Sequence, residues 1–145
     1  MKKLILVLTI ITVAYVSFSN APHLTEAELA APKALSDKTL AQAFENQRSD
    51  LPSTGQGTVI KILSDDNQGH RHQRFIIMLE SGQTLLIAHN IDLAPRIDGL
   101  QKGDVVEFSG EYEWNPKGGV IHWTHRDPAM KHAGGWLKHK GKIYH

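Results

Sequence analysis

Beyond residue 55 the chain alternates between apolar and polar positions, which is the pattern of β-strands with one buried face. Segments rich in Gly, Asn, Asp and Pro interrupt the alternation and are typical of turns. The predicted strands cover residues 57–63, 73–80, 84–91, 105–114 and 120 to about 125. A longer break, residues 92–104, separates the third predicted strand from the fourth. The pattern therefore predicts an all-β domain.

The order of these strands favours one architecture. Five short strands with a long break between the third and the fourth are the order of an OB-fold, a small Greek-key barrel. The segment at residues 99–110, Gly-Leu-Gln-Lys-Gly-Asp-Val-Val-Glu-Phe-Ser-Gly, also resembles the start of the fourth strand in many OB-fold proteins. We predict an all-β fold, a five-stranded OB-fold-like Greek-key barrel with one N-terminal helix and a C-terminal extension.

The alternation also sorts side chains between the two faces of each strand. The side chains predicted to face the core are Val106, Phe108, Tyr112 and Trp114 of the fourth strand and Phe75, Ile77 and Leu79 of the second. The opposite face carries Glu107, Glu111 and Glu113 on the fourth strand and His72 and Arg74 on the second. His89 is in phase with core residues of the third strand, but it lies at the strand's end, where a side chain can emerge at the barrel mouth.

The first 21 residues follow a different pattern. Lys2 and Lys3 precede an apolar run without charge at residues 4–18, and Ser19-Asn20-Ala21 follows with small residues at its first and third places. This is the layout of a cleaved secretory signal peptide, and the run is short for a bilayer span. It predicts an exported protein, periplasmic or secreted, with no stable membrane insertion after cleavage.

Between the signal peptide and the first strand, the pattern predicts a linker and a helix. Residues 22–34 are rich in Ala and contain two prolines, so we interpret them as a linker. Ser36 is a candidate N-cap for a helix that runs to about Arg48, and residues 51–55 are predicted to form a loop after it. Residues 35–145 then form a single domain, and the pattern carries no signal for an oligomeric state.

The composition of the chain limits the kinds of functional site that it can contain. The chain has no cysteine, which excludes disulfides and thiolate sites, so any metal must be bound by His, Asp or Glu. Charge is uneven, because residues 117–145 contain six Lys or Arg and one Asp, whereas residues 55–116 contain five Lys or Arg and nine Asp or Glu. A basic C-terminal segment suits an anionic partner, although an ordinary solvated face would show the same composition.

Eight of the nine histidines fall between His70 and His145, mostly in short polar clusters. Imidazole is useful where protons, metals or phosphates are handled, because its charge changes near neutral pH. The candidate catalytic residues are His89, His122 and His125. The candidate ligand-binding residues are His72, Arg74, Asp92, Arg96, Arg126, His132 and Trp136, and the candidate metal ligands are His70, His72 and His122. Eight of these side chains are expected to meet where the second, third and fifth strands approach the loop after the third: His72, Arg74, His89, Asp92, Arg96, His122, His125 and His132.

Several functions fit these groups. The first is binding of an anionic ligand, foremost DNA or RNA, through arginines and an exposed tryptophan. The second is hydrolysis of a phosphodiester, with imidazoles as acid and base and a divalent metal ion held by Asp92, Glu111 or Asp127. The third is metal binding without catalysis, through the His-x-His pair at residues 70–72. A protein-interaction module is the fourth, so enzymatic activity and a metal cofactor stay open at this point.

Longer strings of residues also resemble a known family. They are Arg71-His72-Gln73-Arg74-Phe75, residues 88–96 (Ala-His-Asn-Ile-Asp-Leu-Ala-Pro-Arg), residues 110–115 (Gly-Glu-Tyr-Glu-Trp-Asn), His122-Trp123-Thr124-His125, and His132 with Gly134-Gly135-Trp136. From about Leu40 to Tyr144 the chain is similar to a family of small exported bacterial proteins classed as a domain of unknown function. The resemblance implies no activity, so function must come from the residues.

Overall fold

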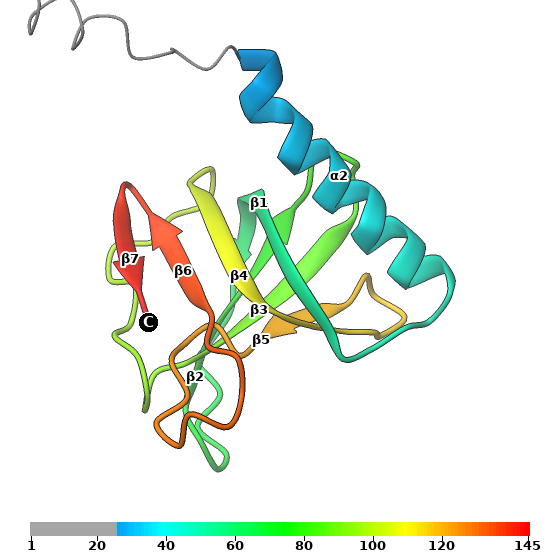
Figure 1. Cartoon of the computed structure of the whole chain (residues 1–145). Helices are drawn as coiled ribbons and strands as arrows, with labels where there is room; N and C mark the ends of the chain where they lie inside the picture. The colour runs from blue at the N-terminus through cyan, green and yellow to red at the C-terminus, as the bar shows by residue number, and fades with distance from the viewer. Residues whose placement is uncertain (1–25) are drawn as a thin grey trace, which may run out of the picture. The chain divides into compact units, whose positions relative to one another are not determined.

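The computed structural model of the chain describes residues 26–145, with side chains from Ser36 onward. Residues 31–145 form one compact unit, and it contains the whole β-sheet (Figure 1). The predicted signal peptide and residues 22–25 of the predicted linker lie outside the described residues. Within the described part, no helix is both long enough and apolar enough to cross a bilayer.

Five strands close into the predicted barrel. The structure contains β1 (Leu51–Ile62), β2 (His72–Met78), β3 (Thr84–Asn90), β4 (Val105–Glu113), β5 (Val120–His122), β6 (Trp136–His139) and β7 (Lys142–Tyr144). The strand order is β1-β2-β3-β5-β4, and β1 also pairs with β4, which closes the ring. The pairing of β3 with β5 is parallel, and the other pairings in the ring are antiparallel. The predicted fold class is confirmed.

The first strand is longer than predicted. Residues 51–55, predicted as a loop, form the first part of β1 and pair with β4, while the last part of β1 pairs with β2. The sequence pattern missed this segment because Ser53 and Thr54 give it no apolar alternation, and its pairing depends on backbone contacts with a distant strand. Gly55 supports that pairing, because a Cβ there would lie only 2.6 Å from Cζ of Phe108.

The barrel core confirms the predicted faces. Phe75, Ile77, Val106, Phe108 and Tyr112 are fully buried. The other fully buried apolar residues of the strands are Val59, Leu85, Ile87, Ile121 and Leu137. Trp114 is partly buried and packs against this cluster. Burial of these side chains is the main favourable contribution to stability, at roughly 25 cal/mol for each Å² of apolar surface removed from water.

The helix α2 (Glu26–Glu45) begins ten residues before the predicted start at Ser36. The pattern indicates a linker for residues 26–34, whereas the structure has helix there, because the Ala, Leu, Glu and Lys residues around Pro32 favour helix. The helix ends at Glu45, before the predicted Arg48, and Gln47 adopts a positive φ of 52° just beyond it. The side chains of Leu40 and Ala43 pack the last turns of this helix against the barrel core.

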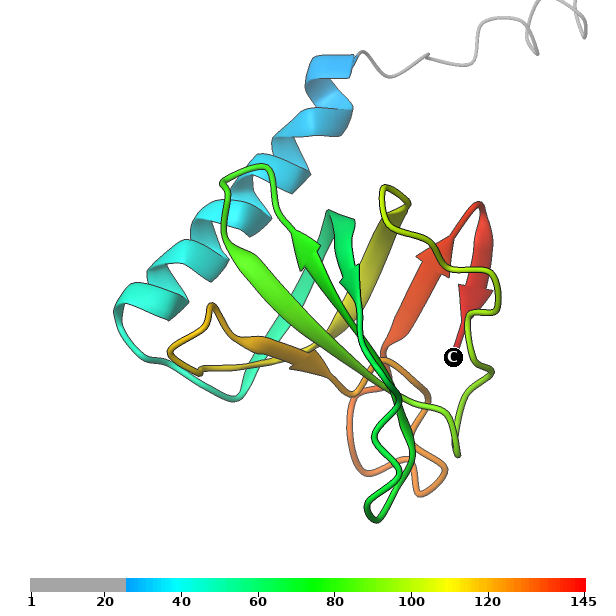
Figure 2. The ribbon, with the colours of Figure 1, turned by 180° about the vertical axis from the view of Figure 1, so that it is seen from behind.

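The C-terminal extension adds a β6–β7 hairpin to the barrel (Figure 2). One edge of β4 pairs with β1, and its other edge is shared between two strands. There β6 pairs with Val106–Ser109 and β5 pairs with Glu111–Glu113. Residues 123–135, which join β5 to β6, therefore leave and return at neighbouring positions on β4. We call this segment the β5–β6 loop.

Candidate functional site

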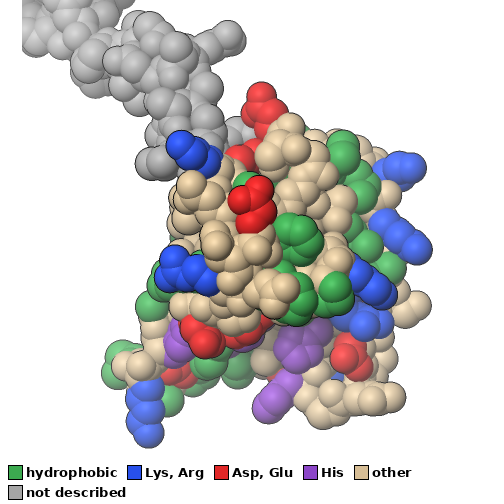
Figure 3. Space-filling view, turned by 90° about the vertical axis from the view of Figure 1, so that its right-hand side faces the viewer, with side chains coloured by type: hydrophobic (Ala, Val, Ile, Leu, Met, Phe, Trp, Pro, Cys, Tyr) green, Lys and Arg blue, Asp and Glu red, His purple; other side chains and the backbone are tan. Residues whose placement is uncertain are grey.

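Three potential metal ligands meet on the outer face of β4 and β5. Glu111 is paired in register with His122, and Glu113 lies two residues farther along the same face. The Nε2 atom of His122 lies 3.5 Å from Oε1 of Glu111 and 3.6 Å from Oε1 of Glu113. All three ligand atoms lie within 4.8 Å of one another. We call Glu111, Glu113 and His122 the triad. Figure 3 shows histidine side chains next to acidic ones toward the lower end of the face in view.

The Nε2 atom of His122 is the least satisfied polar atom of the triad. It is buried and has no hydrogen-bond partner in the described part of the chain. Its separations from the two carboxylate oxygens are longer than ordinary N–H···O hydrogen bonds, whose donor and acceptor lie about 2.7–3.2 Å apart. A buried polar atom without a partner costs free energy, so this geometry indicates that something else satisfies it.

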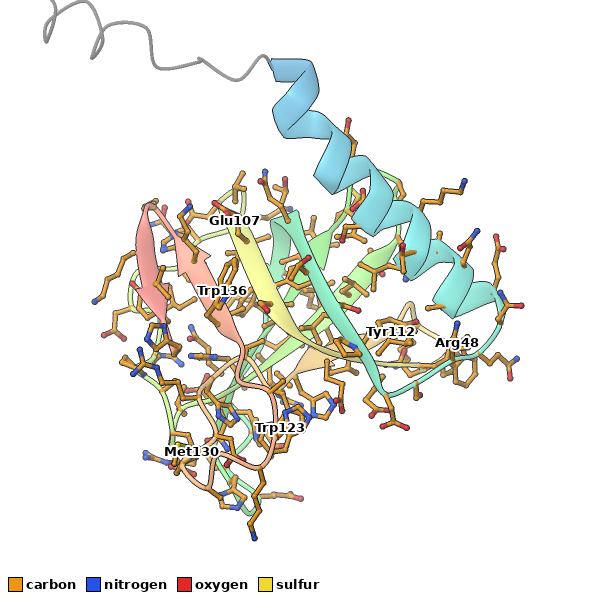
Figure 4. All side chains as sticks on the ribbon, viewed as in Figure 1. Arg48, Glu107, Tyr112, Trp123, Met130 and Trp136 are labelled. Carbon is orange, nitrogen blue, oxygen red and sulfur yellow. The ribbon has the colours of Figure 1, made fainter. Side chains whose placement is uncertain are left out.

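The end of β5 explains how His122 and His125 reach the same region. On a regular strand these two side chains would point to opposite faces. The strand ends at His122, and Trp123 follows with a φ of 55°, a left-handed conformation that bulky residues rarely adopt. Strained residues of this kind cluster at functional sites. Figure 4 places Trp123 at the lower end of the barrel, on the loop that also carries Met130.

His132 fixes the position of the Glu111 carboxylate in the triad. Its Nε2–H donates to Oε2 of Glu111 at 2.9 Å, and its Nδ1–H donates to the carbonyl of Ala133 at 2.7 Å. The hydrogen bond to Glu111 is the main reason that the pKa of His132 is raised above its ordinary value. The ring also stacks on Trp123, with centroids 3.9 Å apart and planes inclined by 10°. These contacts leave Oε1 of Glu111 facing His122.

Asp127 shapes the β5–β6 loop around His132. Its carboxylate accepts hydrogen bonds from the backbone N–H groups of Ala129, Lys131 and His132. These backbone donors, Ala129 first, lower the pKa of Asp127, so the carboxylate stays ionised at neutral pH. The loop is therefore organised by its own residues, and the position of His132 follows from that organisation.

His89 is a buried structural residue rather than a group at the barrel mouth. Its ring is fully buried, with Nδ1 2.8 Å from the hydroxyl of Thr124 and Nε2 3.1 Å from the carbonyl of Pro95. The carbonyl can only accept, so Nε2 carries the proton and Nδ1 accepts from the hydroxyl. Burial lowers the pKa of His89 to about 4, which keeps the ring neutral. The side chain of His89 does not emerge at the barrel mouth, because the segments that carry Pro95 and Thr124 cover it.

A cavity of about 330 Å³ lies beside the triad and shares His122 with it. We call it the histidine cavity, and its lining residues are His70, His72, Ala88, Asn90, Leu93, His122, Trp123 and His125. It is formed by the outer face of β2, β3 and β5 together with the β5–β6 loop. The structure thus brings the predicted His70, His72, His122 and His125 to one place. A single group of metal-ligand atoms lies close enough for one ion in the described residues, and it is the triad.

A comparison with protein families places this arrangement in context. The model of a family described as a protein of unknown function, DUF3465, matches residues 23–145. The chain belongs to this family. The resemblance inferred from the sequence is thereby confirmed, and it extends over the helix, the barrel and the C-terminal hairpin of this DUF3465 chain. Among curated proteins no relative matches the chain.

The other predicted site residues do not line the histidine cavity. Asp92 accepts hydrogen bonds from the backbone N–H and side chain of Arg71, the backbone contact being the main reason that the pKa of Asp92 is lowered. Arg96 forms an ion pair with Asp65 at 2.6 Å. Arg74 donates twice to the carbonyl of Ser64, Arg126 donates to His145, and Trp136 is half-buried on β6. These arginines are thus partnered within the DUF3465 chain.

Sequence reasoning missed Glu113 as a site residue. The alternation placed it on the outer face with Glu111, and a Glu-x-Glu pair on one strand face is a weak metal-binding signal by itself. The deciding fact is that His122 lies directly across from Glu111. That register depends on the turn at residues 114–119, and spacing along the chain does not reveal it.

Proposed function

We propose that this protein binds a divalent transition-metal ion, foremost Zn²⁺, through the triad. The observation that carries the proposal is the buried, unpartnered Nε2 of His122 between two carboxylate oxygens. An ion placed among the three atoms would satisfy all of them at once. One imidazole and two carboxylates are ligands that Zn²⁺ accepts, and three protein ligands leave a position open for water or another ligand.

The distances support an ion of this size. Tetrahedral Zn²⁺ with ligands at about 2.1 Å separates the ligand atoms from one another by about 3.4 Å. The two separations at His122, 3.5 Å and 3.6 Å, are close to this value without any rearrangement. The His132–Glu111 hydrogen bond adds the outer support that metal-binding carboxylates ordinarily have.

Binding of DNA or RNA has weaker support. A phosphate-binding groove needs cationic side chains that are free to meet the backbone. Arg74, Arg96 and Arg126, which were predicted to make such contacts, bind partners within the chain instead. Nucleic-acid binding and export both stay predictions, and the triad is the feature that we carry forward.

We expect purified metal-free protein to bind one equivalent of Zn²⁺ in a calorimetric titration. His122→Ala removes a ligand atom, and Glu113→Gln replaces an anionic carboxylate with a neutral, weakly coordinating amide. Each change should weaken Zn²⁺ affinity at least about a hundredfold, because only two full-strength ligands then remain. Glu107→Gln is the matched control. Glu107 lies on the same strand and face but outside the triad, where it pairs with Lys138.

Equal Zn²⁺ affinity in Glu113→Gln, His122→Ala and Glu107→Gln would contradict the proposal. A parallel titration with Mn²⁺ identifies the kind of ion. The imidazole should make Zn²⁺ bind more tightly than Mn²⁺, as the general order of divalent metal affinities predicts.

A separate prediction concerns His132 as a positioning residue. His132→Asn cannot reach Oε2 of Glu111, so we expect Zn²⁺ affinity to fall about tenfold to a hundredfold, the usual effect of losing an outer hydrogen bond to a metal ligand. His132→Gln, whose longer amide can donate to Glu111, should restore part of that affinity. If the two variants bind Zn²⁺ equally while their melting temperatures differ, His132 serves stability alone.

A further inference from the structure

The histidine cavity contains a buried imidazole with a free ring nitrogen. His125 is only 5% exposed, and its Nδ1 lies 2.7 Å from the carbonyl oxygen of Arg126. Because a carbonyl oxygen can only accept, Nδ1 carries the proton, and the neutral ring has its lone pair on Nε2. Nε2 makes no hydrogen bond with any described residue. The main chain thus holds His125 as a hydrogen-bond acceptor at the wall of the cavity.

Asn90 supplies the complementary donor. Asn90 is 8% exposed, and its Oδ1 accepts the backbone N–H of Asp92 at 2.9 Å. This contact places oxygen toward Asp92 and leaves the amide NH₂, which has no partner among the described residues, to donate elsewhere. His72 pairs with Asn90 in the β2–β3 register and also lines the cavity. Its ring makes no hydrogen bond or ion pair within the described chain.

The lining itself carries no acidic side chain, and the nearest carboxylates lie behind its histidines: Asp92 beside His70, and Glu111 and Glu113 beside His122. Every residue that lines the cavity belongs to the described part of the chain, and none of them carries a carboxylate. The half-buried ring of His72 can donate a hydrogen bond to an anionic oxygen. The amide NH₂ of Asn90 can do the same. A volume of about 330 Å³ is at the small end of ligand pockets, which suits a compact group rather than a whole nucleotide.

We propose that the histidine cavity binds a small oxyanion that keeps one ionisable hydroxyl, with hydrogen phosphate as the representative ligand. The Asn90 amide and His72 donate to its anionic oxygens, and its hydroxyl donates to Nε2 of His125. The inference goes beyond metal binding and does not depend on it, because none of these three side chains belongs to the triad.

Because Nε2 of His125 can only accept a hydrogen bond, we expect the cavity to discriminate between anions. Sulfate has the shape and size of phosphate but carries no proton near neutral pH, so one of its oxygens would face the His125 lone pair without a hydrogen between them. A site built to receive a hydroxyl rejects the analogue that lacks it, because a buried polar atom is then left unpaired. The cavity should therefore prefer phosphate to sulfate.

The test is a calorimetric titration of metal-free protein at pH 8 with phosphate and, separately, with sulfate. We expect phosphate to bind at least about tenfold more tightly than sulfate, on the basis of one charged hydrogen bond. His125→Asn can still donate to the Arg126 carbonyl but has no atom at the position of Nε2. This variant should weaken phosphate binding tenfold or more and abolish the preference for phosphate over sulfate. His145→Asn, the same substitution outside the cavity, should leave both affinities unchanged.

A second measurement keeps the inference falsifiable if His125→Asn does not fold. In wild-type protein labelled with ¹⁵N, phosphate should shift the ring-nitrogen signals of His125 and the side-chain amide signals of Asn90, and equal sulfate should not. Absence of phosphate binding, or equal binding of the two anions, overturns the proposal. Because zinc is absent from these titrations, failure here leaves the triad proposal standing, and failure of zinc binding leaves the phosphate result interpretable.

Discussion

Gly135→Ala is expected to lower the free energy of unfolding by about 3 kcal/mol or more, the upper range for overpacking a rigid site. Gly135 is buried where the β5–β6 loop returns to β4, and its N–H donates to the carbonyl of His125 at 2.9 Å. A Cβ at this position would lie 2.2 Å from the carbonyl oxygens of both Ser109 and Trp123. Both atoms belong to the backbone, so no side-chain rotation can relieve the clash, and the loop must separate from β4.

Urea unfolding followed by tryptophan fluorescence would measure this loss. Gly134→Ala is the matched control, because its Cβ would meet Cα of Arg126 at 3.3 Å from an exposed position, where a small shift suffices. We expect the control to cost less than about 1 kcal/mol. Similar stability of the two variants would show that the loop does not pack against β4 as described.

Acid is expected to destabilise the fold through His89, by about 3 kcal/mol between pH 6.5 and pH 4. The folded protein holds the pKa of His89 at about 4, whereas the unfolded chain has the ordinary value of 6.5. Between these values the unfolded state binds a proton that the folded state does not. The stability that the neutral, buried ring provides is therefore complete above pH 6.5 and is lost as the pH falls toward 4.

The other groups with shifted pKa values act outside this window. Asp92, Asp104 and Asp127 have lowered pKa values, so the stability that they provide is lost at lower pH, below their ordinary value of 3.8. His132 has a raised pKa, so its contribution is present below pH 6.5 and is lost as the pH rises above that value. The interval between pH 6.5 and pH 4 therefore reports mainly on His89.

The check is the unfolding free energy measured at several pH values in wild type and in His89→Gln. The variant cannot become protonated, so its stability should change much less across the interval even if its stability at pH 7 is lower. Parallel curves for the two proteins would mean that another group governs acid unfolding.

The pattern of alternation predicted the barrel well because the position of a core residue along its own strand decides whether it faces the interior. Phe75 and Ile77, like Val106 and Phe108, repeat at every second position and face the interior as expected. The first part of β1 was missed for the opposite reason. Ser53 and Thr54 carry no apolar signal, and their strand is defined by pairing with β4, far along the chain.

The site was predictable in its components but not in its contacts. The excess of histidine pointed to the region of the candidate site, where His72, His122 and His125 line one cavity. Local spacing could not show that Glu113 would reach His122, which depends on the register of two strands. Nor could it show that the Thr124 hydroxyl and the Pro95 carbonyl would bury His89, because both partners come from loops.

The shared edge of β4 also has a consequence for how relatives can diverge. The β5–β6 loop leaves the sheet opposite Glu111 and rejoins it opposite Ser109, two residues away on the same strand. A loop whose ends are this close is an Ω-loop, and its length can change at little entropic cost because closure depends only weakly on length. Trp123, His125 and His132 all lie on it. The residues around the triad and the histidine cavity can therefore vary within the family by insertion or replacement in one segment, while the barrel keeps its strand order.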